Sequence, residues 1–85
     1  MYYLCKKATN MKQIYQCTPK ELYELASQYS KLGVMSRVIQ CYERLLWLGK
    51  LHQRGYLRLA LIYIQRGEKN AAERIYGRYI AIYKD

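Results

Sequence analysis

Cysteine is scarce in this chain of 85 residues, and the cysteines present are poorly placed for a disulfide or metal framework. Cys5, Cys17 and Cys41 are an odd number, lie far apart in the sequence and form no CxxC pair. This pattern fits neither a set of disulfides nor a zinc site. We therefore interpret the cysteines as small apolar residues of a protein in a reducing compartment.

Long hydrophobic runs are also absent from the sequence. No stretch approaches the roughly 18 to 20 apolar residues that a membrane-spanning helix needs. The opening MYYLCKKATN places its charges after its apolar residues and has no long apolar core, unlike a secretory signal. We expect a soluble, cytoplasmic protein without a membrane span.

Residues and motifs that would support catalysis are few. His52 is the only histidine, and it lies in a predicted turn without a second imidazole or paired carboxylates, so we expect it to be structural or exposed. Cys41 lacks a nearby base, which favours a place in the core over a role as nucleophile. The sequence contains no Gly-rich phosphate loop and no HExxH, GxSxG or EF-hand pattern. It therefore predicts no enzyme, no catalytic residues, no cofactor and no metal site.

Acidic residues are outnumbered by basic ones. Asp and Glu total 6 while Lys and Arg total 15, which gives a formal net charge of +9. Such an excess suits an acidic protein partner, a nucleic acid or an anionic membrane surface, and it is also compatible with a solvated exterior alone. A hydrophobic content of 52% excludes a disordered chain, and the length limits the protein to one domain with a small core.

The residues that are present predict an all-α fold. Proline and glycine are rare inside the apolar segments, where apolar residues recur at intervals of three and four. The TPKE motif is a strong helix start, because Thr18 can cap, Pro19 suits the first helical position and Glu21 completes a capping box. Ser36 and Asn70 are candidate caps of two later helices. Helix stops are expected at Gly33, Gly49 and Gly67. We expect about five helices, over residues 2–16, 19–32, 36–48, 52–66 and 70–83.

One pattern repeats within the chain. LASQYSKLG begins at residue 25 and LALIYIQRG at residue 59, 34 residues later, and both contain L-A-x-x-Y-x-x-x-G. The small residue (Ala26, Ala60) lets two helices approach closely, and the tyrosine one turn later fills the gap between hairpins. The glycine permits the sharp turn. The repeated unit is therefore a helical hairpin.

These motifs resemble the tetratricopeptide repeat, a 34-residue helix–turn–helix unit. With Pro19 and Gln53 as first positions, the leucine, alanine, tyrosine and glycine of both copies match the family pattern. The chain departs from it at the early tryptophan, replaced by Leu22 and Tyr56, and at the closing proline, replaced by Lys50 and Lys84. The resemblance implies a superhelical array in one domain, built from a leading half repeat and two full repeats over residues 2–16, 19–52 and 53–85.

The resemblance also implies a concave groove lined by the first helix of each repeat. The family's groove positions correspond to Lys20, Tyr23, Ser27, Ser30 and Lys31 in the first repeat, and to Arg54, Leu57, Leu61, Ile64 and Gln65 in the second. Tyr23, Ser27, Leu57 and Leu61 stand where a terminal-carboxylate clamp would need lysine, asparagine or arginine, which argues against that subtype.

Helix 52–66 carries more apolar residues than one buried stripe requires. Beyond its repeat signature it has Leu57, Leu61, Ile62 and Ile64, and a helix that is apolar nearly all round is covered on more than one side. A helix of a partner laid in the groove would supply this cover. The last helix or the N-terminal helix of the chain itself would supply it equally well, and both explanations stay open at this stage.

We expect a non-catalytic adaptor or chaperone that holds an amphipathic helix of a protein partner, possessing acidic residues to match the basic chain. The resemblance extends to small cytoplasmic chaperones of type III secretion, which hold a needle subunit, often with a small co-chaperone.

Two alternatives compete with the adaptor. A self-assembling structural module, a homo-oligomer or hetero-oligomer, would also cover the apolar helix. A nucleic-acid binder, which we rank below a protein partner, would use the arginine pairs Arg54/Arg58 and Arg74/Arg78 with the interleaved tyrosines. Trp47 is expected to pack against the next hairpin rather than to anchor an interface.

Overall fold

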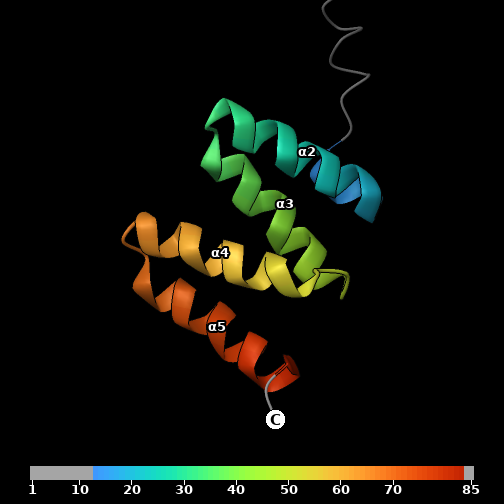
Figure 1. Cartoon of the computed structure of the whole chain (residues 1–85). Helices are drawn as coiled ribbons and strands as arrows, with labels where there is room; N and C mark the ends of the chain where they lie inside the picture. Colours follow the sequence, from blue (N-terminus) through green and yellow to red (C-terminus); the bar gives the residue numbers. More distant parts are fainter. Residues whose placement is uncertain (1–12, 84–85) are drawn as a thin grey trace, which may run out of the picture.

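The computed structural model describes residues 13–83, and all regular secondary structure in this range is helical (Figure 1). The chain forms a short 3-10 turn followed by α-helices, in the order η1 (Ile14–Gln16), α2 (Pro19–Leu32), α3 (Met35–Trp47), α4 (Gln53–Gln65) and α5 (Lys69–Tyr83). The all-α prediction is confirmed.

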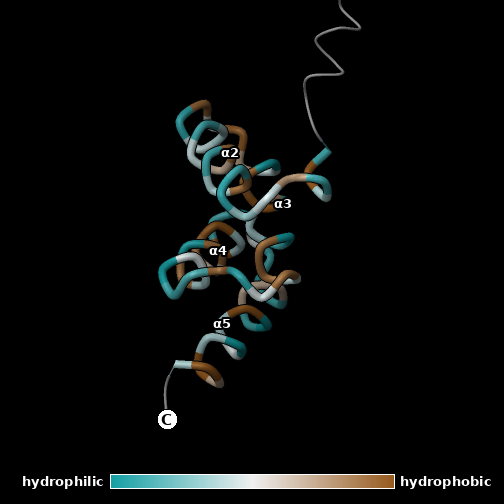
Figure 2. Tube along the Cα trace, turned by 90° about the vertical axis from the view of Figure 1, so that its right-hand side faces the viewer, coloured by the Kyte–Doolittle hydropathy of each residue, from teal (hydrophilic) through white to brown (hydrophobic). Residues whose placement is uncertain are grey.

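The helices pair into two hairpins that follow one another in space. α2 packs along α3, α4 packs along α5, and a smaller contact between α3 and α4 joins the hairpins (Figure 1). Hydrophobic and hydrophilic residues alternate turn by turn along the helices (Figure 2), so each helix has an apolar side to bury and a polar side for water.

The start of α2 is fixed by the capping box. The Glu21 backbone N–H donates to the Thr18 hydroxyl at 3.2 Å, and the Thr18 N–H donates to the Glu21 carboxylate at 2.9 Å. Pro19 occupies the first helical turn, where its missing N–H costs nothing. The predicted capping box is confirmed.

Both hairpin turns use a left-handed glycine. Gly33 and Gly67 have φ of 77° and 79°, a region that residues with a Cβ avoid. The residue after each glycine then donates its N–H to the carbonyl five residues back, Val34 to Tyr29 at 2.9 Å and Glu68 to Tyr63 at 2.8 Å. The expected stops at these glycines are confirmed, and Gly49, with φ of 73°, ends α3 in the same conformation.

The predicted caps Ser36 and Asn70 are wrong. α3 begins at Met35 with Val34 as its cap residue and no capping hydrogen bond, and Asn70 lies inside α5, after Lys69. Each of these helices begins two residues after its turn glycine, so the candidate cap residue already lies inside the helix.

The predicted helix 2–16 is only partly testable, since residues 1–12 lie outside the described residues. At its end, residues 14–16 form a 3-10 turn rather than an α-helix. Cys17 and Thr18 are extended there, with ψ of 149° and 162°. The proline that follows Thr18 disfavours helical backbone at the preceding residue, so an α-helix cannot run on into α2.

The core lies between the paired helices and contains residues of all four α-helices. The fully buried side chains of largest volume are Leu22, Leu45, Leu59, Ile75, Val38 and Cys41. Burial raises the pKa of the Cys41 thiol to about 11, so at neutral pH it is a protonated, apolar side chain. Cys17 is buried as well, which supports the interpretation of these two cysteines as core residues; Cys5 lies outside the described range.

The exposure of two side chains differs from what the sequence indicates. Trp47 was expected to pack but is 74% exposed, since α3 ends at this residue and the facing part of α5 presents charged Arg74 and Arg78 instead of apolar cover. Ile62 was placed beyond the buried stripe of its helix, but it is only 5% exposed and belongs to the core.

No helix within residues 13–83 is both long enough and apolar enough to cross a membrane.

Candidate partner-binding cleft

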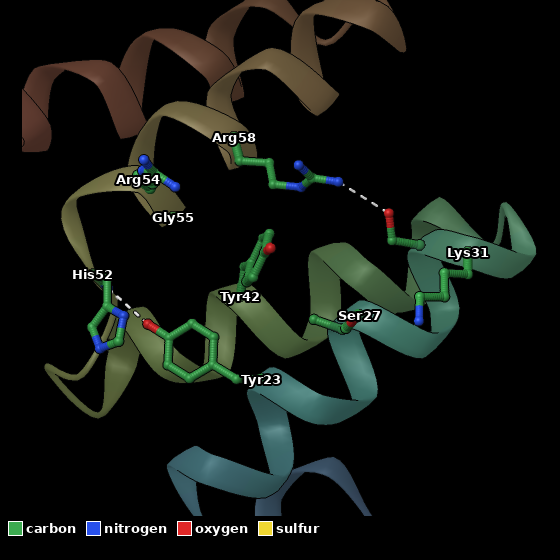
Figure 3. Close-up of a pocket in the computed structure, with 10 residues that line it drawn as sticks. Tyr23, Ser27, Lys31, Tyr42, His52, Arg54, Gly55 and Arg58 are labelled. Carbon is green, nitrogen blue, oxygen red and sulfur yellow. Dashed lines mark hydrogen bonds between the residues drawn. The ribbon is translucent and has the colours of Figure 1, made fainter.

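A cleft of about 670 Å³ opens between the two hairpins (Figure 3). One wall comes from α2, the opposite wall from the start of α4, and Tyr42 of α3 lies between them. The lining residues are Tyr23, Ala26, Ser27, Ser30, Lys31, Tyr42, His52, Arg54, Gly55 and Arg58. The cleft therefore combines residues that lie far apart in the sequence, from Tyr23 to Arg58.

Local helix geometry explains which α2 residues reach the cleft. Tyr23, Ser27, Ser30 and Lys31 recur at intervals of three and four, so they share one face of α2. The opposite face of the helix carries the buried Leu22, which holds α2 on the core. Ser27 and Lys31 are therefore exposed and Tyr23 and Ser30 half-buried, while the helix stays anchored.

The loop between the hairpins is held to α2 by Tyr23. Its hydroxyl accepts a hydrogen bond from the His52 backbone N–H at 2.7 Å and donates to the Lys50 carbonyl at 2.9 Å. The two rings also stack, with centroids 4.6 Å apart. Burial raises the pKa of Tyr23, and the hydrogen bond from His52 opposes that rise in part. His52 is exposed and serves this structural contact, as the sequence predicts.

Gly55 gives the α4 wall its shape. A Cβ at this position would lie 2.4 Å from the Leu51 side chain, which is buried in the core. Glycine therefore lets Leu51 fold back beneath the first turn of α4. The lining on this side consists of backbone at Gly55, flanked by Arg54 and Arg58.

The electrostatic character of the cleft is positive. Lys31 stands on the α2 wall and Arg54 and Arg58 on the α4 wall, and none of the ten lining residues is acidic. The Arg58 guanidinium reaches across the opening and donates to the Ser30 hydroxyl at 3.0 Å (Figure 3). An anionic group entering the cleft would meet cations from both sides, with charge-assisted hydrogen bonds available.

An apolar strip continues from the cleft along α4. Leu57, Leu61 and Ile64 are 42%, 52% and 58% exposed, and their spacing places them beside Arg54 and Arg58 on the exposed side of the helix. No segment within residues 13–83 buries these three side chains, although α5 borders the hollow that Ile64 lines. The last helix, one of the two explanations open from the sequence, therefore does not supply full cover of the strip.

Ile64 also borders a second hollow, between α4 and α5. This hollow has a volume of about 580 Å³ and is lined mainly by apolar groups, among them Ala60, Ala72 and Tyr76. Lys69 and Glu73 stand at it from the first turns of α5. The apolar strip thus connects the basic cleft to an apolar depression.

The structure divides the eight residues predicted to bind a partner. Four of them, Tyr23, Ser27, Lys31 and Arg54, come together in the cleft. Ile64 lines the second hollow. Leu57 and Leu61 form the exposed strip between, and Lys20 is exposed at the start of α2 but lines neither depression.

Sequence reasoning missed five lining residues. Ala26 was assigned only to the close approach of two helices. Arg58 was available as the residue one turn after Arg54 on the same face. Tyr42 packs against the core and also faces the cleft. Nothing in the local sequence marks His52 or Gly55 as lining residues, because their position depends on how the second hairpin follows the first.

Within residues 13–83, no three His, Cys, Asp or Glu side chains lie together in a way that could hold a metal ion. Comparisons of the chain with protein-family models, with curated proteins and with solved structures found no match.

Proposed function

We propose that this protein is a non-catalytic adaptor or chaperone of tetratricopeptide-like architecture, which holds an acidic amphipathic helix of a partner protein on its concave side. The observation that carries the proposal is the juxtaposition of a basic cleft with an uncovered apolar strip on α4. An amphipathic helix with carboxylates beside its apolar stripe complements both features.

The structural equivalence of the two hairpins supports the repeat architecture. Ala26 and Ala60 are both buried, and Gly33 and Gly67 have nearly the same left-handed φ. The hydrogen bonds that close the two turns also correspond. Residues that are 34 positions apart thus have the same structural role, as expected for a repeated helix–turn–helix unit.

Charge supports an acidic partner over a second copy of this chain. Two copies that each carry a formal charge of +9 repel one another, whereas an acidic segment is attracted before contact. In the bound state we expect the apolar stripe of the partner to cover Leu57 and Leu61. Its carboxylates would approach Arg54, Arg58 and Lys31.

The test compares two exposed leucines, one inside the proposed binding surface and one outside it. Leu61 lies in the apolar strip, while Leu32 is 74% exposed at the end of α2 and lines neither the cleft nor the hollow between α4 and α5. Proteins retained from the native host by the wild-type chain would be identified, and the affinity of the strongest candidate measured for Leu61→Glu and Leu32→Glu. We expect Leu61→Glu to weaken binding about tenfold or more and Leu32→Glu to leave it unchanged.

A second pair separates the charge contribution. Arg58→Glu reverses a charge within the cleft, and Arg37→Glu makes the same change on α3 outside it. Only the first should weaken binding of an acidic partner. Equal effects of the two variants, or binding that survives Leu61→Glu, would overturn the assignment of this surface.

A narrower form of the proposal is a type III secretion chaperone whose partner is a needle subunit. The apolar second groove helix suits that role, and the identity of the retained partner decides it.

A further inference from the structure

The side of α3 that faces away from the cleft carries a second surface of different composition. At about 100° per residue, Arg44 and Trp47 lie roughly 160° and 140° around α3 from Tyr42, which faces the cleft. The outer surface is defined here by Tyr15, Arg44, Trp47, Arg74 and Arg78.

Trp47 is the centre of the outer surface. The residue is 74% exposed, and the Arg44 guanidinium lies over one face of its ring at 4.6 Å from the centroid. The same guanidinium donates to the Tyr15 carbonyl oxygen at 3.1 Å, which fixes its position. Tyr15 is itself 64% exposed. One arginine therefore links Trp47 to the segment of Tyr15 and makes a cation–π contact with the indole.

Two further arginines reach this region from α5. A shallow hollow of about 270 Å³ is lined by Glu43, Leu46, Trp47, Arg74 and Arg78. Its one carboxylate, Glu43, accepts hydrogen bonds from Arg74 at 2.9 Å and from the Tyr63 hydroxyl.

Arg74 is thus matched to the carboxylate of Glu43. Arg78 makes no hydrogen bond or ion pair with any other residue of the range 13–83 and is exposed. Arg44 and Arg78 are therefore the positive charges beside Trp47 that no carboxylate within residues 13–83 neutralises.

We propose that the outer surface binds single-stranded nucleic acid, with a base stacked on Trp47 and phosphates contacting Arg44 and Arg78. An exposed indole offers a flat π-surface, and bases of any sequence stack on such a ring. The arginines supply the cations that a phosphate backbone requires. The net charge of +9 adds attraction that does not depend on sequence.

An acidic peptide is the competing occupant, and the shape of the site disfavours it. A peptide side chain anchors in an apolar pocket, but the hollow next to Trp47 is lined by Glu43, Arg74 and Arg78 together with a single leucine. A planar base needs no such pocket. The proposed adaptor site on the concave side is separate, so the two surfaces can be tested independently.

Trp47 is the only tryptophan of the chain, so its fluorescence reports directly on the proposed contact. The full chain would be titrated with short oligothymidine and oligouridine at low and moderate salt. We expect saturable quenching, with an affinity that falls linearly with the logarithm of salt concentration. Absence of quenching at low salt would overturn the proposal.

Variants then assign the binding to this surface, with fluorescein-labelled oligonucleotide anisotropy as the readout. Trp47→Ala should weaken binding about tenfold or more, and Arg78→Ala should weaken it and reduce the salt slope by about one. Arg54→Ala removes the same charge from the cleft and should change little; circular dichroism checks that each variant is folded. If Arg54→Ala matches Arg78→Ala, binding is a property of total charge and the assignment fails.

Poly-glutamate is the final competitor, because it is anionic but has no bases. We expect it neither to quench Trp47 nor to displace the oligonucleotide at equal charge concentration. Quenching and displacement as strong as those of oligothymidine would mean that the surface recognises acidic polypeptide, and the nucleic-acid proposal would be rejected.

Discussion

Alanine substitution at Gly67 and at Gly77 is the same chemical change, and the structure predicts opposite effects on stability. A Cβ would meet no atom within 4 Å at either position, so a steric clash contributes to the stability change of neither variant. What differs is the backbone. Gly67 has φ of 79° in the α4–α5 turn, whereas Gly77 lies inside α5 with helical geometry.

The magnitudes follow from conformational preferences. Placing a Cβ in the left-handed region costs about 1–2 kcal/mol. Alanine also lowers the conformational entropy of the unfolded chain, which offsets up to about 1 kcal/mol of that cost. Gly67→Ala should therefore destabilise by about 1 kcal/mol. Gly77→Ala should stabilise by about 1 kcal/mol, because alanine is the better helix former by that amount. The two variants should differ by about 2 kcal/mol in the free energy of unfolding.

Thermal and urea unfolding, followed by circular dichroism, measure this difference. For a domain of this size, 1 kcal/mol corresponds to about 4–8 °C in Tm, so the two variants should melt about 10 °C apart, on either side of the wild type. A neutral Gly67→Ala would refute the left-handed turn. A destabilised Gly77→Ala would mean that α5 does not run as a regular helix through this residue.

Three further predictions concern single side chains. Tyr23→Phe removes the hydroxyl that links Lys50 and His52, and should cost about 1 kcal/mol and speed amide exchange at His52, measured by NMR. The raised pKa of Cys41, about 11, and its burial predict no alkylation by iodoacetamide in the native state at pH 8, and modification after unfolding, mapped by mass spectrometry; reaction of native Cys41 would contradict its place in the core. Burial, and after it the hydrogen bond to the Glu43 carboxylate, raises the pKa of Tyr63 from its ordinary value of 10.0 to about 12. The associated stability is present in full below pH 10 and is lost as the pH rises toward 12, and Tyr63→Phe should flatten this part of the stability–pH profile.

Helices and turns could be predicted from the sequence because their signals are local. The capping box at Thr18 and the glycines of the turns act through neighbours a few residues away. The same holds for burial on a single helix. Tyr56, Leu59, Ala60 and Tyr63 lie on the buried side of α4 because their spacing puts them there together.

Predictions that depended on the neighbouring hairpin fared less well. Spacing alone does not tell whether a residue at the margin of a buried stripe is covered, and Ile62 and Trp47 were both misplaced for that reason. The predicted groove residues likewise follow a helical face, but a face becomes a cleft only where a second helix stands opposite it. Tyr23 and Arg54 meet such a neighbour, and Lys20 does not.

By itself the sequence determined an all-α chain, its turns and the apolar stripe of each helix, since these depend on backbone conformation and on residue spacing within one element. Only the tertiary structure decided that Lys31, Arg54 and Arg58 share one cleft, that Leu61 stays uncovered and that Trp47 stands exposed beside Arg78. The physical reason is that the angle and distance between the hairpins arise from packing between side chains far apart in the sequence. That packing leaves no local signal at the residues whose exposure it sets.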